Sequence, residues 1–188
     1  MIRCIALFSL LTATALPPAS LFQDPAGAAP GAEHTHLTKL AGDWTVVTTF
    51  RFPGSPAQEF QGKAHGVAIL GGRFVQFDET AVEFGAPVER QKTWGFNKQS
   101  RKYESTWMYT GSTAVMRLAG DAAKDGKSIA GSASFAGDKG SAQDFTWTLV
   151  WIDDDHFSTT LTAPANGKAG AATFQAVYTR TTSKHTPR

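Results

Sequence analysis

The sequence has a single cysteine among its 188 residues, and this residue, Cys4, stands in an N-terminal segment that we expect to be cleaved. The mature protein should then contain no thiol, which excludes a disulfide, a thiolate nucleophile and a cysteine-ligated metal. Charged residues are also scarce: they make up 18% of the chain, whereas soluble domains average roughly 25%. No run of lysine and arginine is long enough to form a basic patch, so we expect no nucleic-acid partner.

Long apolar runs are absent except near the start. Arg3 precedes an apolar stretch that continues through Ala15, and this stretch is shorter than the roughly 20 residues that a membrane-spanning helix needs. Small residues stand at the end of this stretch, at Ala13-Thr14-Ala15, and again shortly after it at Ala19-Ser20. This pattern predicts a cleaved signal peptide at residues 1–20 and a periplasmic or secreted protein without a transmembrane segment. Residues 21–32, rich in Pro, Ala and Gly, are predicted to be a disordered leader.

The remainder of the chain is rich in aromatic residues and glycine, with 5 Trp, 13 Phe and 18 Gly. A short helical turn at 34–40 is followed by about ten segments in which bulky residues recur at every second position, as in Phe145, Trp147, Leu149 and Trp151. Short turns separate the segments, so sequential strands should be neighbours. The pattern predicts an all-β domain at 33–181, an antiparallel up-and-down β-barrel of about eight to ten strands, with a polar tail at 182–188. A β-sandwich is the alternative.

Aromatic residues that share a strand face suggest a ligand site. If these faces point inward, the rings either line a cavity or fill the interior, and the sequence does not separate the two. Arginines on nearby strands could supply a polar contact, and Arg73, after the Gly71-Gly72 turn, either receives an acidic head group at the barrel mouth or is a solvent-exposed turn residue. The candidate ligand-binding residues are Arg73, Arg90, Trp94, Tyr103, Trp107, Tyr109, Arg117 and Trp147.

Motifs for catalysis, metals and cofactors are missing. There is no nucleophile elbow, phosphate-binding loop or dinucleotide fingerprint. His34 and His36 lack a third ligand in sequence, and the run Asp153-Asp154-Asp155 lacks the spacing of a calcium loop, so a helix-start pair and a hairpin turn are the favoured interpretations. We therefore predict no catalytic residue, metal or cofactor.

Two local features resemble the lipocalins and related calycin barrels. Gly42-Asp43-Trp44 stands at the start of the first strand, and Arg180 ends the last one. In lipocalin-like barrels a cationic side chain of the last strand packs over that tryptophan, so the resemblance implies that Gly42, Trp44 and Arg180 form the structural closure of the barrel.

A longer resemblance, from His36 to Arg180, is to the bacterial domain-of-unknown-function family 1579. It is carried by His36-x-x-Leu-x-x-Leu-Ala-Gly-Asp-Trp44, Leu70-Gly-Gly-Arg-Phe-Val75, Trp94-Gly-Phe-Asn97, Lys102-Tyr-Glu-Ser-Thr-Trp107 and Val177-Tyr-Thr-Arg180. It implies a lipocalin-like barrel and no established activity.

Three functions remain open at this point. The first is a binding module that holds a small apolar or amphipathic molecule in the barrel. The second is a calycin-type isomerase or hydrolase, which would need a buried titratable group among His65, Arg73, Glu79 and Tyr103. The third is a structural or interaction protein of the cell envelope.

Overall fold

The computed structural model describes residues 29–136, 142–165 and 170–181. The predicted signal peptide at 1–20, most of the predicted leader at 21–32 and the predicted tail at 182–188 lie outside the described residues. The last residue assigned to the leader, Ala32, already begins the first helix.

One short helix precedes a run of strands in the described residues. The helix α1 spans Ala32–Leu37 and continues into a 3₁₀ turn, η1, at Thr38–Leu40. The strands that follow are β1 (Gly42–Arg51), β2 (Gln58–Ile69), β3 (Phe74–Glu83), β4 (Ala86–Asn97), β5 (Lys102–Tyr109), β6 (Met116–Ala122), β7 (Ser128–Ala136), β8 (Ala142–Trp151), β9 (His156–Thr162) and β10 (Thr173–Arg180).

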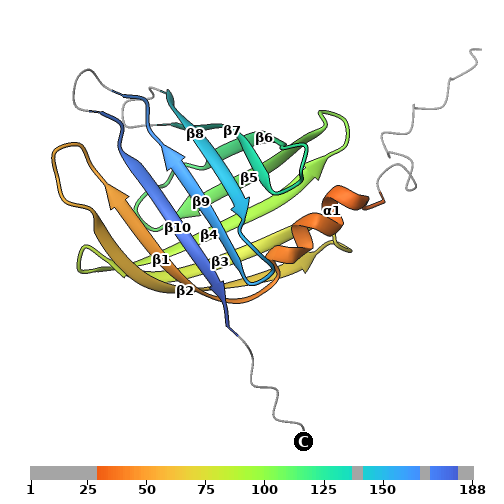
Figure 1. Cartoon of the computed structure of the whole chain (residues 1–188), viewed down its shortest axis with the longest axis horizontal. Coiled ribbons are helices and arrows are strands. Elements are labelled where there is room, and N and C mark those ends of the chain that lie inside the picture. The colour runs from red at the N-terminus through yellow and green to blue at the C-terminus, as the bar shows by residue number, and fades with distance from the viewer. Residues whose placement is uncertain (1–28, 137–141, 166–169, 182–188) are drawn as a thin grey trace, which may run out of the picture.

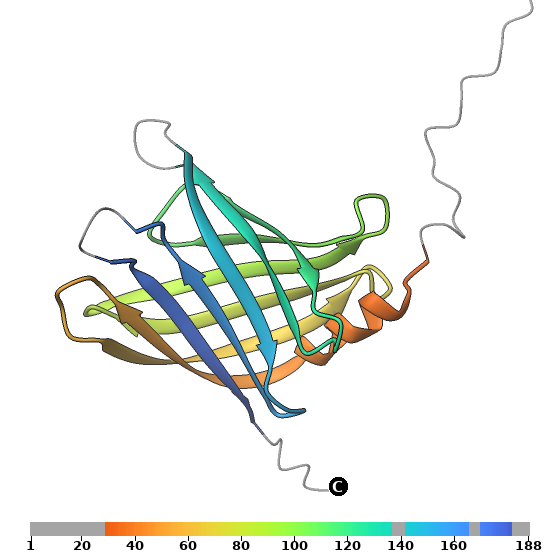
Figure 2. The ribbon, with the colours of Figure 1, turned by 45° about the horizontal axis from the view of Figure 1, so that its top comes forward.

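Each strand pairs antiparallel with the next, and β10 closes the sheet against β1 (Figures 1 and 2). Closure leaves no exposed sheet edge. The predicted fold class, an all-β antiparallel up-and-down barrel with a short N-terminal helical turn, is confirmed, with ten strands in the barrel.

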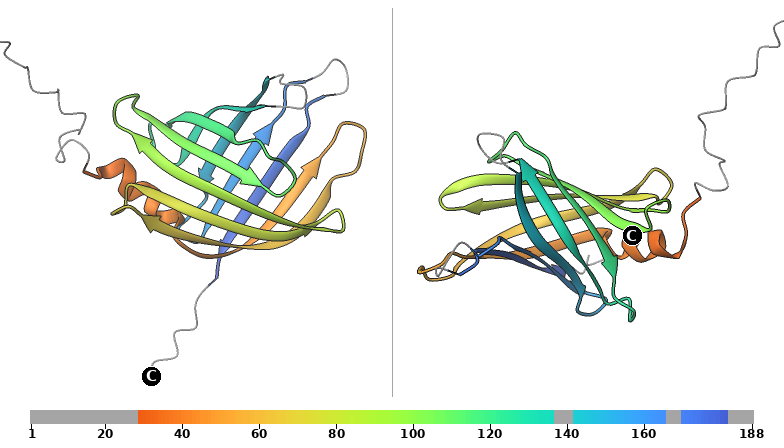
Figure 3. Two further views of the ribbon diagram at one scale, coloured as in Figure 1. Left: turned by 180° about the vertical axis from the view of Figure 1, so that it is seen from behind. Right: turned by 90° about the horizontal axis from the view of Figure 1, so that it is seen from above.

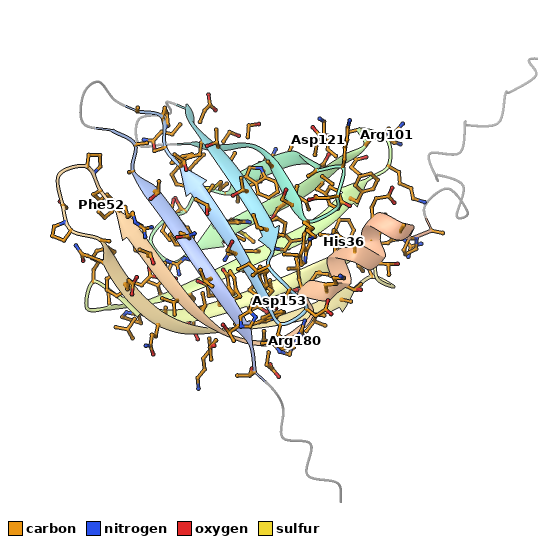
Figure 4. All side chains as sticks on the ribbon, in the orientation of Figure 1. His36, Phe52, Arg101, Asp121, Asp153 and Arg180 are labelled. Carbon is orange, nitrogen blue, oxygen red and sulfur yellow. The ribbon has the colours of Figure 1, made fainter. Side chains whose placement is uncertain are left out.

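The two ends of the barrel differ. Helix α1 lies across one end, where it contacts β3 and β4 (Figure 3). The turns after β1 and β3 lie at the opposite end, so His36 and Phe52 mark the two ends in Figure 4. We call the first the helix end and the second the open end. Within the described residues, no helix has the length and apolar character needed to cross a membrane.

The period-two pattern places the bulky residues inside. Along β1, Trp44, Val46 and Thr48 are buried, whereas Thr45 and Val47 between them are exposed. The aromatic faces of β4, β5 and β8 also point inward, because their alternate residues are the buried ones.

Rings fill the barrel near the helix end. The ring of Trp94 lies 5.6 Å from that of Trp147 and 5.9 Å from that of Trp107, measured between centroids. Gly120 leaves room for Trp147, because a Cβ on Gly120 would lie 3.0 Å from the Trp147 ring. Its direct partner Gly131 lets β6 and β7 approach closely, because a Cβ there would lie 1.9 Å from the Ala119 oxygen. This half of the interior is solid.

Candidate functional site

The open half of the barrel contains a cavity of about 670 Å³. Small-molecule sites usually have volumes of roughly 300–1,000 Å³. The walls are mostly apolar and are contributed by eight of the strands and the turns between them. The lining residues include the aromatic residues Phe50, Phe84, Trp107, Tyr109 and Phe174, the charged residues Glu83, Arg90 and Lys92, and Met116.

Phenylalanines surround the mouth of the cavity. The Phe50 ring lies between 5.1 and 6.1 Å from four other rings, those of Phe52, Phe60, Phe84 and Phe174. Phe84 is 55% exposed although it belongs to this cluster. An apolar rim of this kind favours molecules that leave water readily.

Charged side chains form the floor of the cavity: Glu83, Arg90 and Lys92 line it, and Glu79 and Tyr178 lie directly behind them. Arg90 donates to Glu79 Oε1 at 2.8 Å and makes a short contact with Glu83 Oε2. Lys92 Nζ donates to Glu79 Oε2 at 2.7 Å and to the Tyr178 hydroxyl at 2.7 Å. The Tyr178 hydroxyl in turn donates to Glu79 Oε2 at 2.8 Å. We call these five residues the charged floor.

The register of β3 and β4 brings the charges together. Glu79 is the direct cross-strand partner of Arg90, and side chains of such partners lie within contact distance. Glu83 and Lys92 stand at even spacing from these two residues, so they point to the same inner face. Side-chain exposure is 0% for Glu79, 1% for Lys92, 4% for Glu83 and 10% for Arg90.

Burial and mutual attraction displace the pKa values of the floor. Burial alone would raise the pKa of Glu79, but the charges of Lys92 and Arg90 outweigh it and leave this pKa below its usual value. Burial lowers the pKa of Lys92 despite the neighbouring carboxylate. For Tyr178, burial together with the charge of Glu79 raises the hydroxyl pKa well above 10.0.

The floor also has aromatic neighbours and one free acceptor. Lys92 Nζ lies 4.7 Å from the centroid of the Trp107 ring, and the Arg90 guanidinium lies 5.2 Å from that of Phe174. Both distances suit cation–π contacts. Glu83 Oε1 is buried and has no hydrogen-bond partner. The remaining carboxylate oxygens of the floor accept from Arg90, Lys92 or Tyr178.

The eight candidate ligand-binding residues occupy four different places. Arg90, Trp107 and Tyr109 line the cavity. The other three aromatic candidates, Trp94, Tyr103 and Trp147, are buried in the core of the barrel, and none of them lines the cavity.

The two remaining arginines lie away from the cavity. Arg73 follows the turn after β2, at the helix end, where its guanidinium donates to the Leu70 oxygen at 3.1 Å. Arg117 lines a separate hollow of about 400 Å³ over the outward residues of β4 to β8. The charged floor draws its five side chains from β3, β4 and β10.

The three closure residues meet at the helix end. The Arg180 guanidinium carbon lies 4.1 Å from the centroid of the Trp44 ring. Arg180 donates to the oxygens of Ala41 and Lys39 at 2.9 Å each, and Trp44 Nε1 donates to the Leu40 oxygen at 3.0 Å. Gly42 has a φ of 120°, and a Cβ there would lie 2.6 Å from Arg180, so a side chain would fit neither the backbone nor the space.

Sequence reasoning named Glu79 as an enzyme candidate but did not name Glu83, Lys92 or Tyr178. A signal for Lys92 existed, because it shares the parity of Trp94 and therefore faces inward with it. None of the four titratable enzyme candidates lines the cavity itself. Glu79 lies behind Arg90 and Lys92 in the charged floor, and His65 is exposed and contacts Asp43 at 2.6 Å. Arg73 lies at the turn after β2 and Tyr103 in the core.

A lipocalin-like barrel, half solid and half hollow, is the class of protein that this fold and cavity define. The family of proteins of unknown function called DUF1579 matches residues 29–180, and the chain belongs to it. The resemblance stated from the sequence is thereby confirmed. No curated protein matches the sequence.

Two solved structures share the fold. The structure of Rv2717c from M. tuberculosis superposes with a TM-score of 0.58 at 17% identity, covering 81% of this chain and 99% of that chain. The S-type phycobiliprotein lyase CPES from Guillardia theta superposes with a TM-score of 0.56 at 8% identity, covering 85% of this chain and 97% of that chain. At these identities the likeness is one of fold.

Proposed function

We propose that this protein is a binding module that holds a small apolar or amphipathic molecule in the open half of its barrel. The observation that supports the proposal most strongly is the cavity of about 670 Å³ between the phenylalanine rim and the charged floor. Binding sites for small molecules combine mostly apolar walls with a few polar groups in this way. An interior solid throughout would instead have favoured a structural role.

Native mass spectrometry tests the proposal directly. Protein purified from its host should carry a bound small molecule. Denaturation releases this molecule, and its mass then identifies it. A Met116→Trp variant, which fills the cavity from one wall, should lose this molecule. The matched control is Val115→Trp, at the exposed neighbouring position, which should keep it. Ligand-free spectra from several preparations, or equal loss from both variants, would contradict the proposal.

We also propose that the protein is exported to the periplasm or secreted after removal of its signal peptide. The support is the sequence of residues 1–20, with a positive start, a short apolar run and small residues at the predicted cut sites. Intact-mass measurement of the protein from fractionated host cells tests this. The mass should correspond to a chain that begins after Ala15 or within a few residues of it, and full-length protein in the cytosol would contradict export.

An enzymatic role is the second candidate, and the charged floor favours it. Buried titratable groups with displaced pKa values beside a cavity are frequent in active sites, and Glu79, Lys92 and Tyr178 meet this description. The fold is also that of a phycobiliprotein lyase. The recovered ligand should then be chemically changed on incubation with the wild-type protein and unchanged with Tyr178→Phe. Unchanged ligand in both incubations would leave binding as the function.

A further inference from the structure

We infer that the cavity selects uncharged molecules whose polar end donates a hydrogen bond, such as alcohols, and rejects carboxylates. The inference rests on the proposed binding function and narrows it to a ligand class. An arginine and a lysine in an apolar cavity would ordinarily suggest a ligand with an acidic head group, but here both are already paired with carboxylates.

The charges of the floor already balance. Arg90 and Lys92 carry two positive charges, and Glu79 and Glu83 carry two negative ones. Each cation is held by a carboxylate at hydrogen-bond distance, Arg90 by both carboxylates and Lys92 by Glu79. A ligand carboxylate would have to displace one of these carboxylates or add an unpaired negative charge to a buried site, and both are unfavourable.

Both cations also lie over aromatic rings. Lys92 Nζ makes two hydrogen bonds and lies over the Trp107 ring, and the guanidinium of Arg90 lies over the Phe174 ring. Each cation therefore already has a carboxylate and a ring as partners, which reduces the binding energy that an incoming anion could gain.

The acceptor that the floor leaves free is Glu83 Oε1. Glu83 lines the cavity, its side chain is 4% exposed, and this oxygen has no hydrogen-bond partner. A buried acceptor without a partner is destabilising. This oxygen has almost no accessible surface, so a ligand hydroxyl removes the penalty when the Glu83 carboxylate turns toward the cavity that the residue lines. A hydroxyl group does so without bringing a charge, which a carboxylate at neutral pH cannot do.

Three ligands of nearly the same chain length separate the contributions of charge and hydrogen-bond donor. Dodecanol has a donor and no charge, dodecyl methyl ether has neither, and dodecanoate has a charge and no donor. Isothermal titration calorimetry on the wild-type protein at neutral pH should find dodecanol the tightest binder. The ether should bind several-fold more weakly, and dodecanoate at least about tenfold more weakly, which corresponds to about 1.4 kcal/mol.

A charge-removing variant should weaken the preference against the anion. Glu83→Gln leaves the floor with one net positive charge, so its affinity for dodecanoate should rise by about tenfold and its preference for dodecanol should shrink. Glu89→Gln is the matched control, because it removes one charge from an exposed position near the same turn. It should leave all three affinities unchanged.

The outcomes separate the inference from the proposed function. No binding of any of the three ligands, by a folded protein freed of its resident molecule, would count against the binding function itself. Binding of dodecanoate as tightly as dodecanol would keep that function and overturn the inference. So would a folded Glu83→Gln protein with unchanged affinity for dodecanoate. If Glu83→Gln does not fold, the wild-type comparison still decides.

Discussion

Arg180 and Trp44 stand directly opposite each other in the β1–β10 pair that closes the barrel. The guanidinium lies over the indole ring, and its remaining donors reach the backbone oxygens of Ala41 and Lys39. One side chain therefore ties the last strand, the first strand and the 3₁₀ turn η1 together at the helix end (Figure 4).

Substitution of Arg180 should weaken this closure. Arg180→Lys retains the charge but loses the planar group that stacks and donates at two places at once. We expect the free energy of unfolding in urea to fall by about 1–3 kcal/mol, from the stacking contact and the hydrogen bonds together. Arg117→Lys is the matched control, since Arg117 lies exposed on β6, and an equal loss in both variants would contradict a closing role.

The charged floor should be sensitive to the loss of one partner. Lys92→Met leaves Glu79 buried without its nearest cation, and breaking a buried pair in this way typically destabilises by about 3–5 kcal/mol. Lys63→Met, at an exposed position of β2, should change the unfolding free energy very little. The double variant Glu79→Gln/Lys92→Met should recover part of the loss, and a double variant as unstable as the sum of the two single variants would show that the two groups are independent.

The free energy of unfolding should fall in mild acid because two histidines at the helix end, His34 and His36, are partly buried. Burial lowers the pKa of both His34 and His36 below the ordinary value of 6.5, with Lys98 and Lys39 adding to the effect. The folded protein therefore binds fewer protons than the unfolded chain just below pH 6.5, so the free energy of unfolding decreases as the pH falls through this range. Urea unfolding from pH 7.5 to 5.5 measures the slope.

Variants assign this slope to particular histidines. His36 packs against Trp151, with ring centroids 4.0 Å apart, and His36→Gln should flatten the pH dependence. A His36→Gln protein that keeps the wild-type slope would place the titrating group elsewhere. Below pH 4.5 a second loss should begin, because the pKa of Glu79 is depressed in the folded protein and its protonation favours unfolding.

Local sequence patterns predicted the strands well because barrel strands are half-buried on one side. The alternation of Phe145, Trp147 and Leu149 depends only on neighbouring residues, and the structure buries this face of β8. Closure is a different matter, since Trp44 and Arg180 are far apart in the chain and their pairing follows from no local pattern. Only the resemblance to the lipocalins implied this pairing from the sequence.

The candidate site was harder to predict. The alternation along a strand tells which side chains face inward, but it does not tell at which level along the barrel axis they lie. Trp94 and Arg90 both point inward from β4, yet Trp94 belongs to the solid half and Arg90 to the cavity. The level of a residue in a barrel depends on the stagger between strands, which no single segment encodes. The charged floor likewise depends on the register that sets Glu79 opposite Arg90.

The rim residue Phe84 has an unfavourable backbone conformation, and we expect its ring to contact the ligand. It has a φ of 51° in the two-residue turn between β3 and β4, a conformation that is rare for bulky residues and that asparagine tolerates better. Phe84 nevertheless places its ring 4.7 Å from that of Phe60 and 5.1 Å from that of Phe50, beside the cavity. Phe84→Asn should therefore leave the unfolding free energy within about 1 kcal/mol of wild type, while the affinity for dodecanol falls several-fold in calorimetric titration. Ile152→Asn, which removes an exposed apolar side chain at the other end of the barrel, should leave that affinity intact, and an equal loss in both variants would show that the rim makes no specific contact with the ligand.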